Sequence, residues 1–219
     1  MPLLPHIELQ TDAEPDAAVI WLHGLGASGH DFEPLVPELH LPQGSGVRFI
    51  FPHAPEIPVT VNGGMVMPAW YDILEMDLDR KLDIGQLRDS AHQIQRLIDR
   101  EIERGIDSRR IVVAGFSQGG AVAIEAALTY PKPLAGLLAL SSYFATWESL
   151  RVNPANASLP IAVMHGLRDP MVPESQGRKS VERLESFGFK PVYSTYPMEH
   201  QVCLEEIADI SRWLQQILA

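Results

Sequence analysis

Ser117 lies in the pentapeptide GFSQG, residues 115–119, where a glycine stands two positions away on each side of the serine. This G-x-S-x-G spacing is typical of a nucleophile elbow, a strand-to-helix turn so sharp that only residues without bulk fit beside the serine. The apolar residues 111–114 predict a buried strand before it, and residues 121–128 predict a buried helix after it. A serine that merely caps this helix is the alternative. We disfavour it because a cap needs no glycine two positions earlier.

A serine hydroxyl needs a base and an orienting acid before it can attack a carbonyl group near neutral pH. In chains with this elbow, the acid and then the histidine follow the serine. His165 and His200 are the two histidines after Ser117, and Asp169 is the one aspartate between Ser117 and His200. This order predicts a triad of Ser117, Asp169 and His200. Glu148 is the weaker alternative for the acid, because it lies in a polar stretch away from a strand end.

The negative oxygen that forms during such an attack also needs hydrogen-bond donors. With this elbow, one donor is the backbone amide after the nucleophile, and the other lies in a glycine loop after an early strand. Gln118 would supply the first amide, and Leu25 in the loop HGLGASG, residues 23–29, would supply the second. We interpret His23 as a residue that braces this loop rather than as a second base.

Strands and helices alternate along the chain in an order that would bring these residues together. Strands are expected at residues 17–22, 47–51, 111–114, 134–140, 161–164 and 191–196, the last with an alternating pattern, and helices at 86–104, 121–128, 174–187 and 204–218. Such alternation predicts an α/β fold with a mostly parallel central sheet and helices on both faces. Because ligands gather at the carboxyl edge of such sheets, the loops after residues 22, 116 and 164 should converge there.

Composition limits the kind of protein and the partners it can have. The 219 residues, of which 46% are hydrophobic, suffice for a single domain over residues 1–219 with a substantial core. The formal net charge of −11 repels nucleic acid and anionic lipid surfaces, so neither is an expected partner. Cys203 is the only cysteine, which excludes an internal disulfide and a cysteine cluster for zinc. We therefore expect no metal site.

The apolar stretches of the sequence are all short. None approaches the roughly 20 residues that span a bilayer, and residues 1–18 lack the basic and apolar regions of a secretory signal. A cytoplasmic protein without a transmembrane segment is the prediction, and a mature periplasmic chain is the alternative. The sequence does not fix the oligomeric state, and a homodimer is among the states it leaves open.

Five long motifs extend over nearly the whole chain: VIWLHGLGASGHDF, FPHAPEIPVTVNGGMVMPAWYDI, GFSQGGAVA, HGLRDPMVP and YPMEHQVCLEEI. Together they resemble the carboxylesterase and acyl-protein thioesterase family of small α/β-hydrolases. The resemblance implies the α/β-hydrolase fold without a large lid domain. It also implies hydrolysis of carboxylic esters or acyl thioesters, with no cofactor. It carries Ser117, Asp169 and His200 over as the triad, with the Leu25 and Gln118 amides as the oxyanion donors.

Two residues depart from the usual pattern of that family. Ala27 stands where an acid is frequent, and Glu199 stands where a small residue is frequent. We expect both differences to have little effect, since the oxyanion donors are backbone amides and a loop glutamate usually points to solvent.

Residues 57–84 do not fit a long helix and combine methionines with other large apolar side chains. The equivalent segment of the family lies near the active site, so we predict that this segment lines an acyl groove. The flexible thioether of methionine would accommodate varied acyl chains. Packing of these side chains against the sheet is the alternative. The residues predicted to bind substrate are Met65, Met67, Trp70 and Leu74, with Met76 close by in the sequence.

The predicted partner is thus a small ester or acylated substrate with a short-to-medium acyl chain. The same elbow and triad also fit a peptidase, a lactonase or a perhydrolase, which a panel of substrates would distinguish. A ligand-binding protein on a hydrolase scaffold is a further alternative. It is disfavoured because such proteins usually lose a catalytic residue, and all three are present here.

Overall fold

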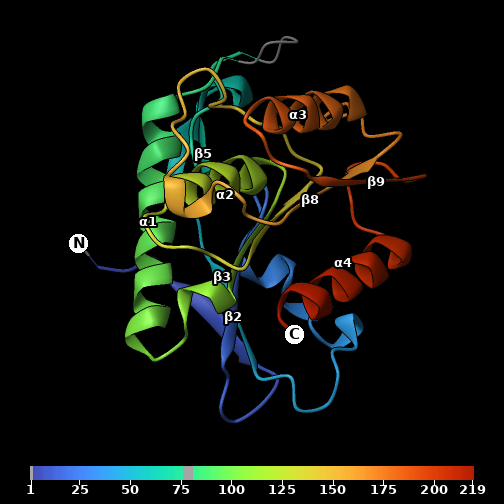
Figure 1. The fold of residues 1–219 in the computed structure, drawn as a ribbon. Coiled ribbons are helices and arrows are strands. Elements are labelled where there is room, and N and C mark those ends of the chain that lie inside the picture. The colour runs from blue at the N-terminus through green and yellow to red at the C-terminus, as the bar shows by residue number, and fades with distance from the viewer. Residues whose placement is uncertain (1, 76–80) are drawn as a thin grey trace.

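The computed structural model describes residues 2–75 and 81–219 of the chain. Seven strands from these residues form one sheet (Figure 1). One strand at the edge of the sheet is antiparallel to its neighbour, and all other neighbouring strands are parallel. The spatial order is β1 (His6–Gln10), β3 (Val47–Pro52), β2 (Ala17–Leu22), β6 (Ile111–Phe116), β7 (Gly136–Leu140), β8 (Ile161–Gly166) and β9 (Val192–Tyr196).

Helices cover both faces of this sheet, as the alternation of elements predicts. Figure 1 shows α4 on the opposite side of the sheet from α1 and α2. The helices are α1 (Ile84–Glu103), α2 (Gln118–Thr129), α3 (Glu174–Ser186) and α4 (Leu204–Ile217). Short 3-10 helices lie in the connections: η1 (Gly29–Asp31), η2 (Glu33–Leu35), η3 (Pro37–Leu39), η4 (Thr60–Asn62), η5 (Ser108–Arg110) and η6 (Pro154–Asn156).

The observed elements differ most from the predicted ones before residue 75. The sequence pattern predicts neither β1 nor the antiparallel hairpin of β4 (Glu56–Val59) and β5 (Met65–Pro68). β1 lies at the edge of the sheet and is only half-buried, so it lacks the continuous apolar run of a buried strand. Pro58 within β4 weakens the strand pattern there, since proline cannot donate to the ladder.

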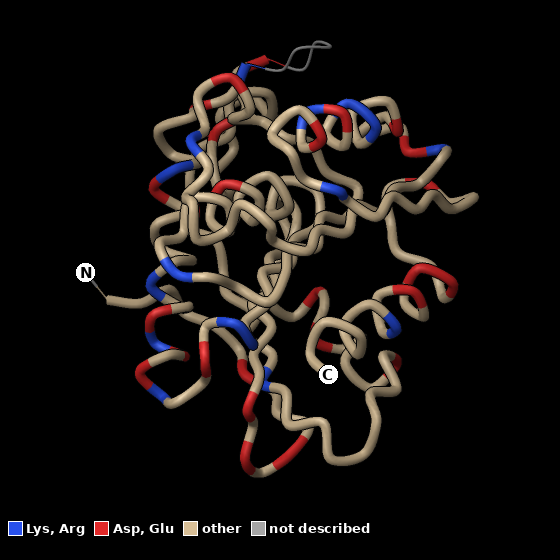
Figure 2. Tube along the Cα trace, viewed as in Figure 1, with Lys and Arg blue, Asp and Glu red and all other residues tan. Residues whose placement is uncertain are grey.

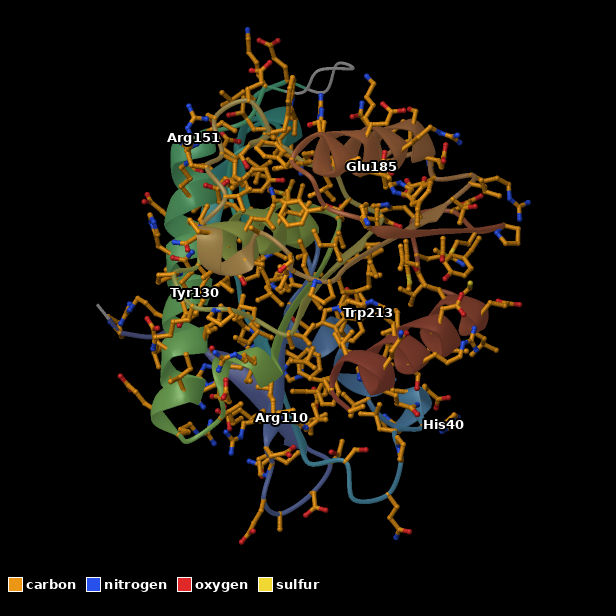
Figure 3. All side chains as sticks on the ribbon, viewed as in Figure 1. His40, Arg110, Tyr130, Arg151, Glu185 and Trp213 are labelled. Carbon is orange, nitrogen blue, oxygen red and sulfur yellow. The ribbon has the colours of Figure 1, made fainter. Side chains whose placement is uncertain are left out.

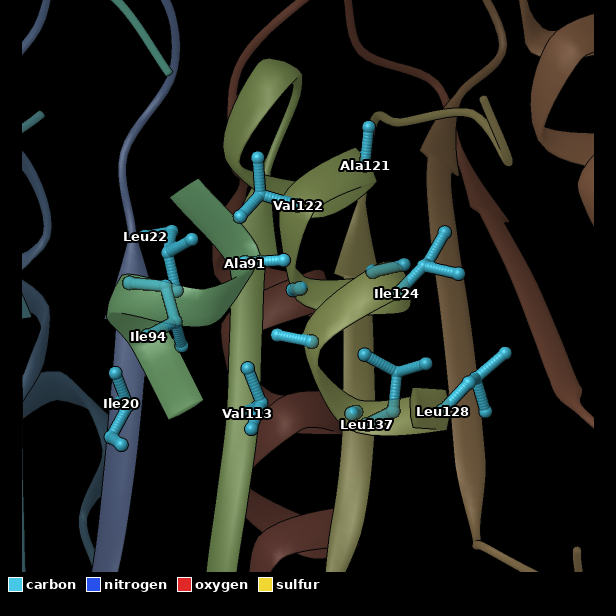
Figure 4. Packing of buried hydrophobic residues seen from close by; sticks show 14 of the residues in the cluster. Ile20, Leu22, Ala91, Ile94, Val113, Ala121, Val122, Ile124, Leu128 and Leu137 are labelled. Atoms are coloured by element: carbon cyan, nitrogen blue, oxygen red, sulfur yellow. The ribbon is translucent and has the colours of Figure 1, made fainter. Parts of the chain in front are cut away.

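Apolar side chains pack on each face of the sheet and fix the helices to it. In Figure 4, side chains of three central strands meet side chains of α1 and α2. Each large side chain buried in this way stabilises the fold by about 1.5–3 kcal/mol. The labelled residues are Ile20, Leu22, Val113 and Leu137 from the strands, Ala91 and Ile94 from α1, and Ala121, Val122, Ile124 and Leu128 from α2.

On the other face, α4 lies against the sheet through Trp213, which Figure 3 labels between the helix and the strands. Gly136 of β7 provides the space for this ring, because a Cβ atom there would lie 2.8 Å from the indole. The close contact sets how near α4 lies to the sheet. α4 also follows directly after the loop that carries His200, so its packing helps to hold that loop in place.

Charged side chains gather on the helices and the connecting loops, and Figure 2 shows both signs along α1 and α3. Among the helices of residues 2–75 and 81–219, none has the length and apolar character needed to cross a membrane. Within the same part of the chain, no three histidine, cysteine or acidic side chains cluster so that they could hold a metal ion.

Candidate active site

Ser117 occupies the sharp turn between β6 and α2 and has a positive φ of 53°. Two glycines permit this turn. A Cβ on Gly115 would lie 2.3 Å from the carbonyl oxygen of Gly119, and a Cβ on Gly119 would lie 2.4 Å from the carbonyl oxygen of His23. The side chain of Ser117 makes no capping hydrogen bond to α2. The structure therefore contradicts the capping alternative and presents the serine as a nucleophile elbow would.

The backbone around the serine is held by the neighbouring strand. The N–H of Ser117 donates to the carbonyl of Leu140 at 2.8 Å. The hydroxyl of Ser142, just beyond the end of β7, donates to the carbonyl of Ser117 at 2.7 Å. These bonds fix a residue whose positive φ costs on the order of 1–3 kcal/mol.

The structure brings Ser117, His200 and Asp169 into one chain of hydrogen bonds. Nε2 of His200 lies 2.9 Å from the hydroxyl oxygen of Ser117, and Nδ1 of His200 lies 2.6 Å from Oδ2 of Asp169. Because a carboxylate only accepts, Nδ1 carries the hydrogen and Nε2 accepts from the serine. The ring of Phe116 lies against His200, with 4.7 Å between the ring centroids. The imidazole is thus held in the tautomer that a general base for Ser117 requires.

Asp169 is buried, and its side chain is aimed by the turn that follows β8. Oδ1 accepts hydrogen bonds from the backbone N–H groups of Met171 and Val172, both at 2.8 Å. Burial alone would raise the pKa of the Asp169 carboxyl, but the hydrogen bonds from His200, Val172 and Met171 outweigh it and hold the pKa below its usual value. Asp169 is therefore ionised at neutral pH and oriented toward His200.

The glycine loop after β2 is braced from several sides. Nδ1 of His23 lies 2.7 Å from the carbonyl of Gly24, while its Nε2 accepts the N–H of Ala54 at 3.1 Å. The indole N–H of Trp70 donates to the carbonyl of His23 at 2.8 Å. Burial lowers the pKa of His23 to about 4, so the ring is neutral and accepts at Nε2. These contacts agree with the interpretation of His23 as a bracing residue.

The two predicted oxyanion donors, Leu25 and Gln118, line the same cavity as Ser117. Within the described part of the chain, no acceptor is hydrogen-bonded to the backbone N–H of either residue. The side chain of Gln118 is buried: its Oε1 accepts the N–H of Trp70 at 2.8 Å, and its amide donates to the carbonyl of Tyr71 at 2.7 Å. Gln118 thereby connects the elbow to the segment after β5. No pattern in the sequence indicates this role of the side chain.

The cavity above Ser117 has a volume of about 430 Å³. None of the four residues predicted to bind substrate lies among those that line it. Met65 and Leu74 are 63% and 41% exposed, Met67 is half-buried with its sulfur 3.3 Å from the Asn62 amide, and Trp70 is buried beneath the glycine loop. Met65 and Met67 belong to β5, and Trp70 and Leu74 follow it, so a role of these four residues in substrate binding stays a prediction. Met76 lies outside the described residues.

Other residues of the same segment do reach the cavity. Val61 and Ile73 line it, as do Tyr143 after β7 and Met171 after β8. Tyr143 and Met171 stand just past the carboxyl ends of parallel strands, which is the signal by which the sequence could have revealed them. Asp31, Phe116 and Val172 complete the wall together with Gly24, Ala27 and Asn62.

Glu148, the weaker alternative for the acid, lies apart from this chain of hydrogen bonds. Its side chain is exposed and lines a different cavity, beside Trp147 and Arg183. His165, the other histidine after the elbow, is buried in β8 and does not line the cavity that contains Ser117.

Comparison with known proteins identifies the family. The Phospholipase/Carboxylesterase family model matches residues 5–218. The chain belongs to the phospholipase/carboxylesterase family. The chain is similar to acyl-protein thioesterase 1 of Neurospora crassa, with 39% identity over 225 residues that cover 98% of this chain and 92% of that protein. It is also 38% identical to acyl-protein thioesterase 1 of Gibberella zeae over 213 residues, which cover 92% and 91% of the two chains.

Solved structures of similar proteins share the fold of this chain. The crystal structure of Zea mays acyl-protein thioesterase 2 superposes with a TM-score of 0.86 at 26% identity, over 98% of this chain and 99% of that chain. The predicted α/β-hydrolase fold without a large lid is thereby confirmed. As a member of the phospholipase/carboxylesterase family, the protein is an enzyme, a serine hydrolase.

Proposed function

We propose that the protein hydrolyses carboxylic esters or acyl thioesters through a covalent acyl-enzyme on Ser117. The observation that carries the proposal is the unbroken hydrogen-bond chain from Ser117 through His200 to Asp169, in which Ser117 and His200 line one cavity. His200 removes the proton as the Ser117 oxygen attacks the carbonyl carbon. Asp169 stabilises the imidazolium that forms. The alcohol or thiol then leaves with a proton from His200.

The second half of the cycle returns the enzyme to its starting state. A water molecule gives its proton to His200 and attacks the acyl carbon, and the acid leaves as the Ser117 hydroxyl reforms. We assign the N–H groups of Leu25 and Gln118 to the oxyanion in both halves, since both residues line the cavity and neither N–H has an acceptor among the described residues. In other hydrolases the loss of one such donor costs about 2.7–4 kcal/mol of barrier lowering.

We further propose that the acyl chain lies against Val61, Ile73, Tyr143 and Met171. Apolar atoms dominate these side chains, and Met171 is 52% exposed, so it can adapt to acyl chains of different length. The cavity volume of about 430 Å³ lies at the small end of the range of about 300–1,000 Å³ for small-molecule sites. It therefore favours short-to-medium acyl chains.

The resemblance to two acyl-protein thioesterases supports thioesters as well as oxygen esters as substrates. Peptidase, lactonase and perhydrolase activities share the same nucleophile and base, so they stay alternatives within the same chemistry. We keep the expectation of a cytoplasmic enzyme that needs no cofactor.

A substrate panel tests this proposal. Wild type and Ser117→Ala are compared on p-nitrophenyl esters from acetate to palmitate and on acyl thioesters of the same chain lengths, with lactones and peptide anilides alongside. We expect hydrolysis of the esters or thioesters by wild type, with a short-to-medium optimum, and background rates for Ser117→Ala. Turnover that survives in Ser117→Ala would refute the assignment of the nucleophile. Faster turnover of lactones or anilides would instead favour one of the alternative activities.

A further inference from the structure

A second histidine lies beside the acid of the proposed triad without taking part in the hydrogen-bond chain. His165 is fully buried near the carboxyl end of β8, four residues before Asp169. Its Nε2 lies 2.8 Å from the carbonyl oxygen of Val172 and 3.7 Å from Oδ2 of Asp169. Because His165 does not line the cavity, it cannot touch substrate. The contacts raise the question of what a buried imidazole does at this place.

The tautomer of His165 follows from its contacts. A carbonyl oxygen can only accept, so Nε2 carries the hydrogen that points to Val172. Nδ1 is buried and has no hydrogen-bond partner among the described residues. Burial lowers the pKa of His165, and the carbonyl of Val172 opposes this only in part. The ring is therefore neutral, with its hydrogen on Nε2.

The other side of the ring is closed by α3. Gly177 lies directly against the imidazole, since a Cβ atom at this position would be 2.4 Å from Nδ1. A larger residue would force the ring away from Val172. Contacts with α3, with β8 and with the carbonyl of Val172 thus hold the His165 ring in a single orientation.

This position matters because Val172 is bonded at both of its backbone groups. Its N–H donates to Oδ1 of Asp169 at 2.8 Å, and its carbonyl accepts from His165. The turn from Asp169 to Val172 is thus tied to the rigid strand through the His165 ring. Rotation of this turn would move Oδ2 of Asp169 away from Nδ1 of His200, which it meets at 2.6 Å.

We propose that His165 is a positioning residue for the triad acid: its Nε2–H holds the Val172 carbonyl and thereby the turn that aims Asp169 at His200. The inference rests on the proposed function of Ser117, His200 and Asp169. The neutral state of the His165 ring is part of this positioning role, because an imidazolium 3.7 Å from Oδ2 of Asp169 would compete with His200 for the same oxygen. His165 itself exchanges no proton during the cycle.

Two substitutions separate the hydrogen bond from simple packing. His165→Leu removes the donor, whereas the amide nitrogen of Gln in His165→Gln can take the place of Nε2 and donate to Val172. Val163→Ala is the matched control, because Val163 is a buried residue of the same strand whose apolar side chain has no group that could donate to Val172. The readouts are kcat and KM for p-nitrophenyl butyrate, the acidic limb of the kcat/KM profile against pH, and the NMR signal of the His200 Nδ1 proton.

We expect His165→Leu to lower kcat by about 10- to 100-fold with little change in KM, as misplaced supporting groups do in other sites. The acidic limb should move to lower pH and the His200 Nδ1 proton signal should shift or broaden, since a misaimed carboxylate stabilises the imidazolium less. His165→Gln should restore most of kcat and both other readouts. Val163→Ala should lower stability while all three readouts of the folded enzyme stay as in wild type.

Wild-type kcat, acidic limb and proton signal in folded His165→Leu would overturn the inference, and so would a His165→Gln variant as impaired as His165→Leu. If His165→Leu does not fold, Gly177→Ala provides the second test, because it displaces the ring while the donor is kept. Gly177→Ala should lower kcat and move the acidic limb of the kcat/KM profile to lower pH. Unchanged values of both would overturn the inference. Failure of the proposed function itself is distinguishable: wild type would then show no hydrolysis that depends on Ser117.

Discussion

Replacement of Glu206 by glutamine is expected to stabilise the protein increasingly as the pH rises. Glu206 lies in the first turn of α4 and is completely buried. Neither of its carboxylate oxygens makes a hydrogen bond of ordinary geometry to a described residue. Burial raises the pKa of Glu206 from 4.5 to about 8. The folded protein therefore holds a proton that the unfolded chain releases.

The sign and the size of the effect follow from this difference. Between pH 4.5 and pH 8 the folded state binds more protons at Glu206 than the unfolded state does, so its contribution to stability falls as the pH rises. Shifting a pKa from 4.5 to about 8 makes this contribution fall by about 3 kcal/mol between pH 5.5 and pH 8. Glutamine does not titrate, so Glu206→Gln should escape this loss.

Urea unfolding of wild type and Glu206→Gln at several pH values between 5.5 and 8.5 measures the difference directly. The variant should gain about 3 kcal/mol relative to wild type between pH 5.5 and pH 8. Glu205→Gln is the matched control, since Glu205 is the exposed neighbour on the same turn and its replacement should show no such trend. A difference between wild type and Glu206→Gln that is constant across this range would refute the reasoning.

Three further changes test other parts of the site. Asp169→Asn should keep the fold by circular dichroism and lower kcat by about 10⁴-fold, the loss seen when serine proteases lose the acid that orients the imidazole; near wild-type kcat would refute the role of Asp169 as the acid. Because burial lowers the pKa of His23 to about 4, the unfolded chain binds a proton at this residue at a higher pH than the folded protein does. Wild type should therefore lose about 2.5 kcal/mol of stability relative to His23→Gln between pH 6.5 and pH 4. A difference in the free energy of urea unfolding between the two proteins that stays constant over this pH range would contradict the prediction. Gln118→Leu should lower the free energy of unfolding by about 2–4 kcal/mol, because it removes two buried hydrogen bonds to the backbone of residues 70–71; an unchanged melting temperature would contradict that estimate.

Local pattern and chain order were sufficient to predict the elements that hold the proposed triad. The run before Ser117 forms a strand because its β-branched residues are buried from both sides, and this is visible in the sequence alone. The order of serine, aspartate and histidine selected Asp169 and His200, which lie 31 residues apart and meet at 2.6 Å. Parallel topology makes such loops converge at one edge, so the prediction needed no knowledge of side-chain direction.

The wall of the cavity could not be predicted in the same way. Apolar composition selected Met65 and Leu74, yet the β4–β5 hairpin and the chain after it leave both exposed, while Ile73 is turned inward. Which side chain of a short irregular segment faces a cavity depends on its local backbone geometry, for which the sequence has no period to read. The bridging contacts of Gln118 depend in the same way on segments 47 residues apart in the chain.

The acyl-enzyme on Ser117 is the central claim, and its direct detection is the most decisive measurement. Wild type is mixed with p-nitrophenyl butyrate in a stopped-flow instrument, quenched with acid during turnover and analysed by mass spectrometry of the peptide that contains Ser117. We predict a burst of nitrophenol stoichiometric with the enzyme and a butyryl group on Ser117, both lost in Ser117→Ala. A butyryl group on another residue, or a burst that persists in Ser117→Ala, would contradict it.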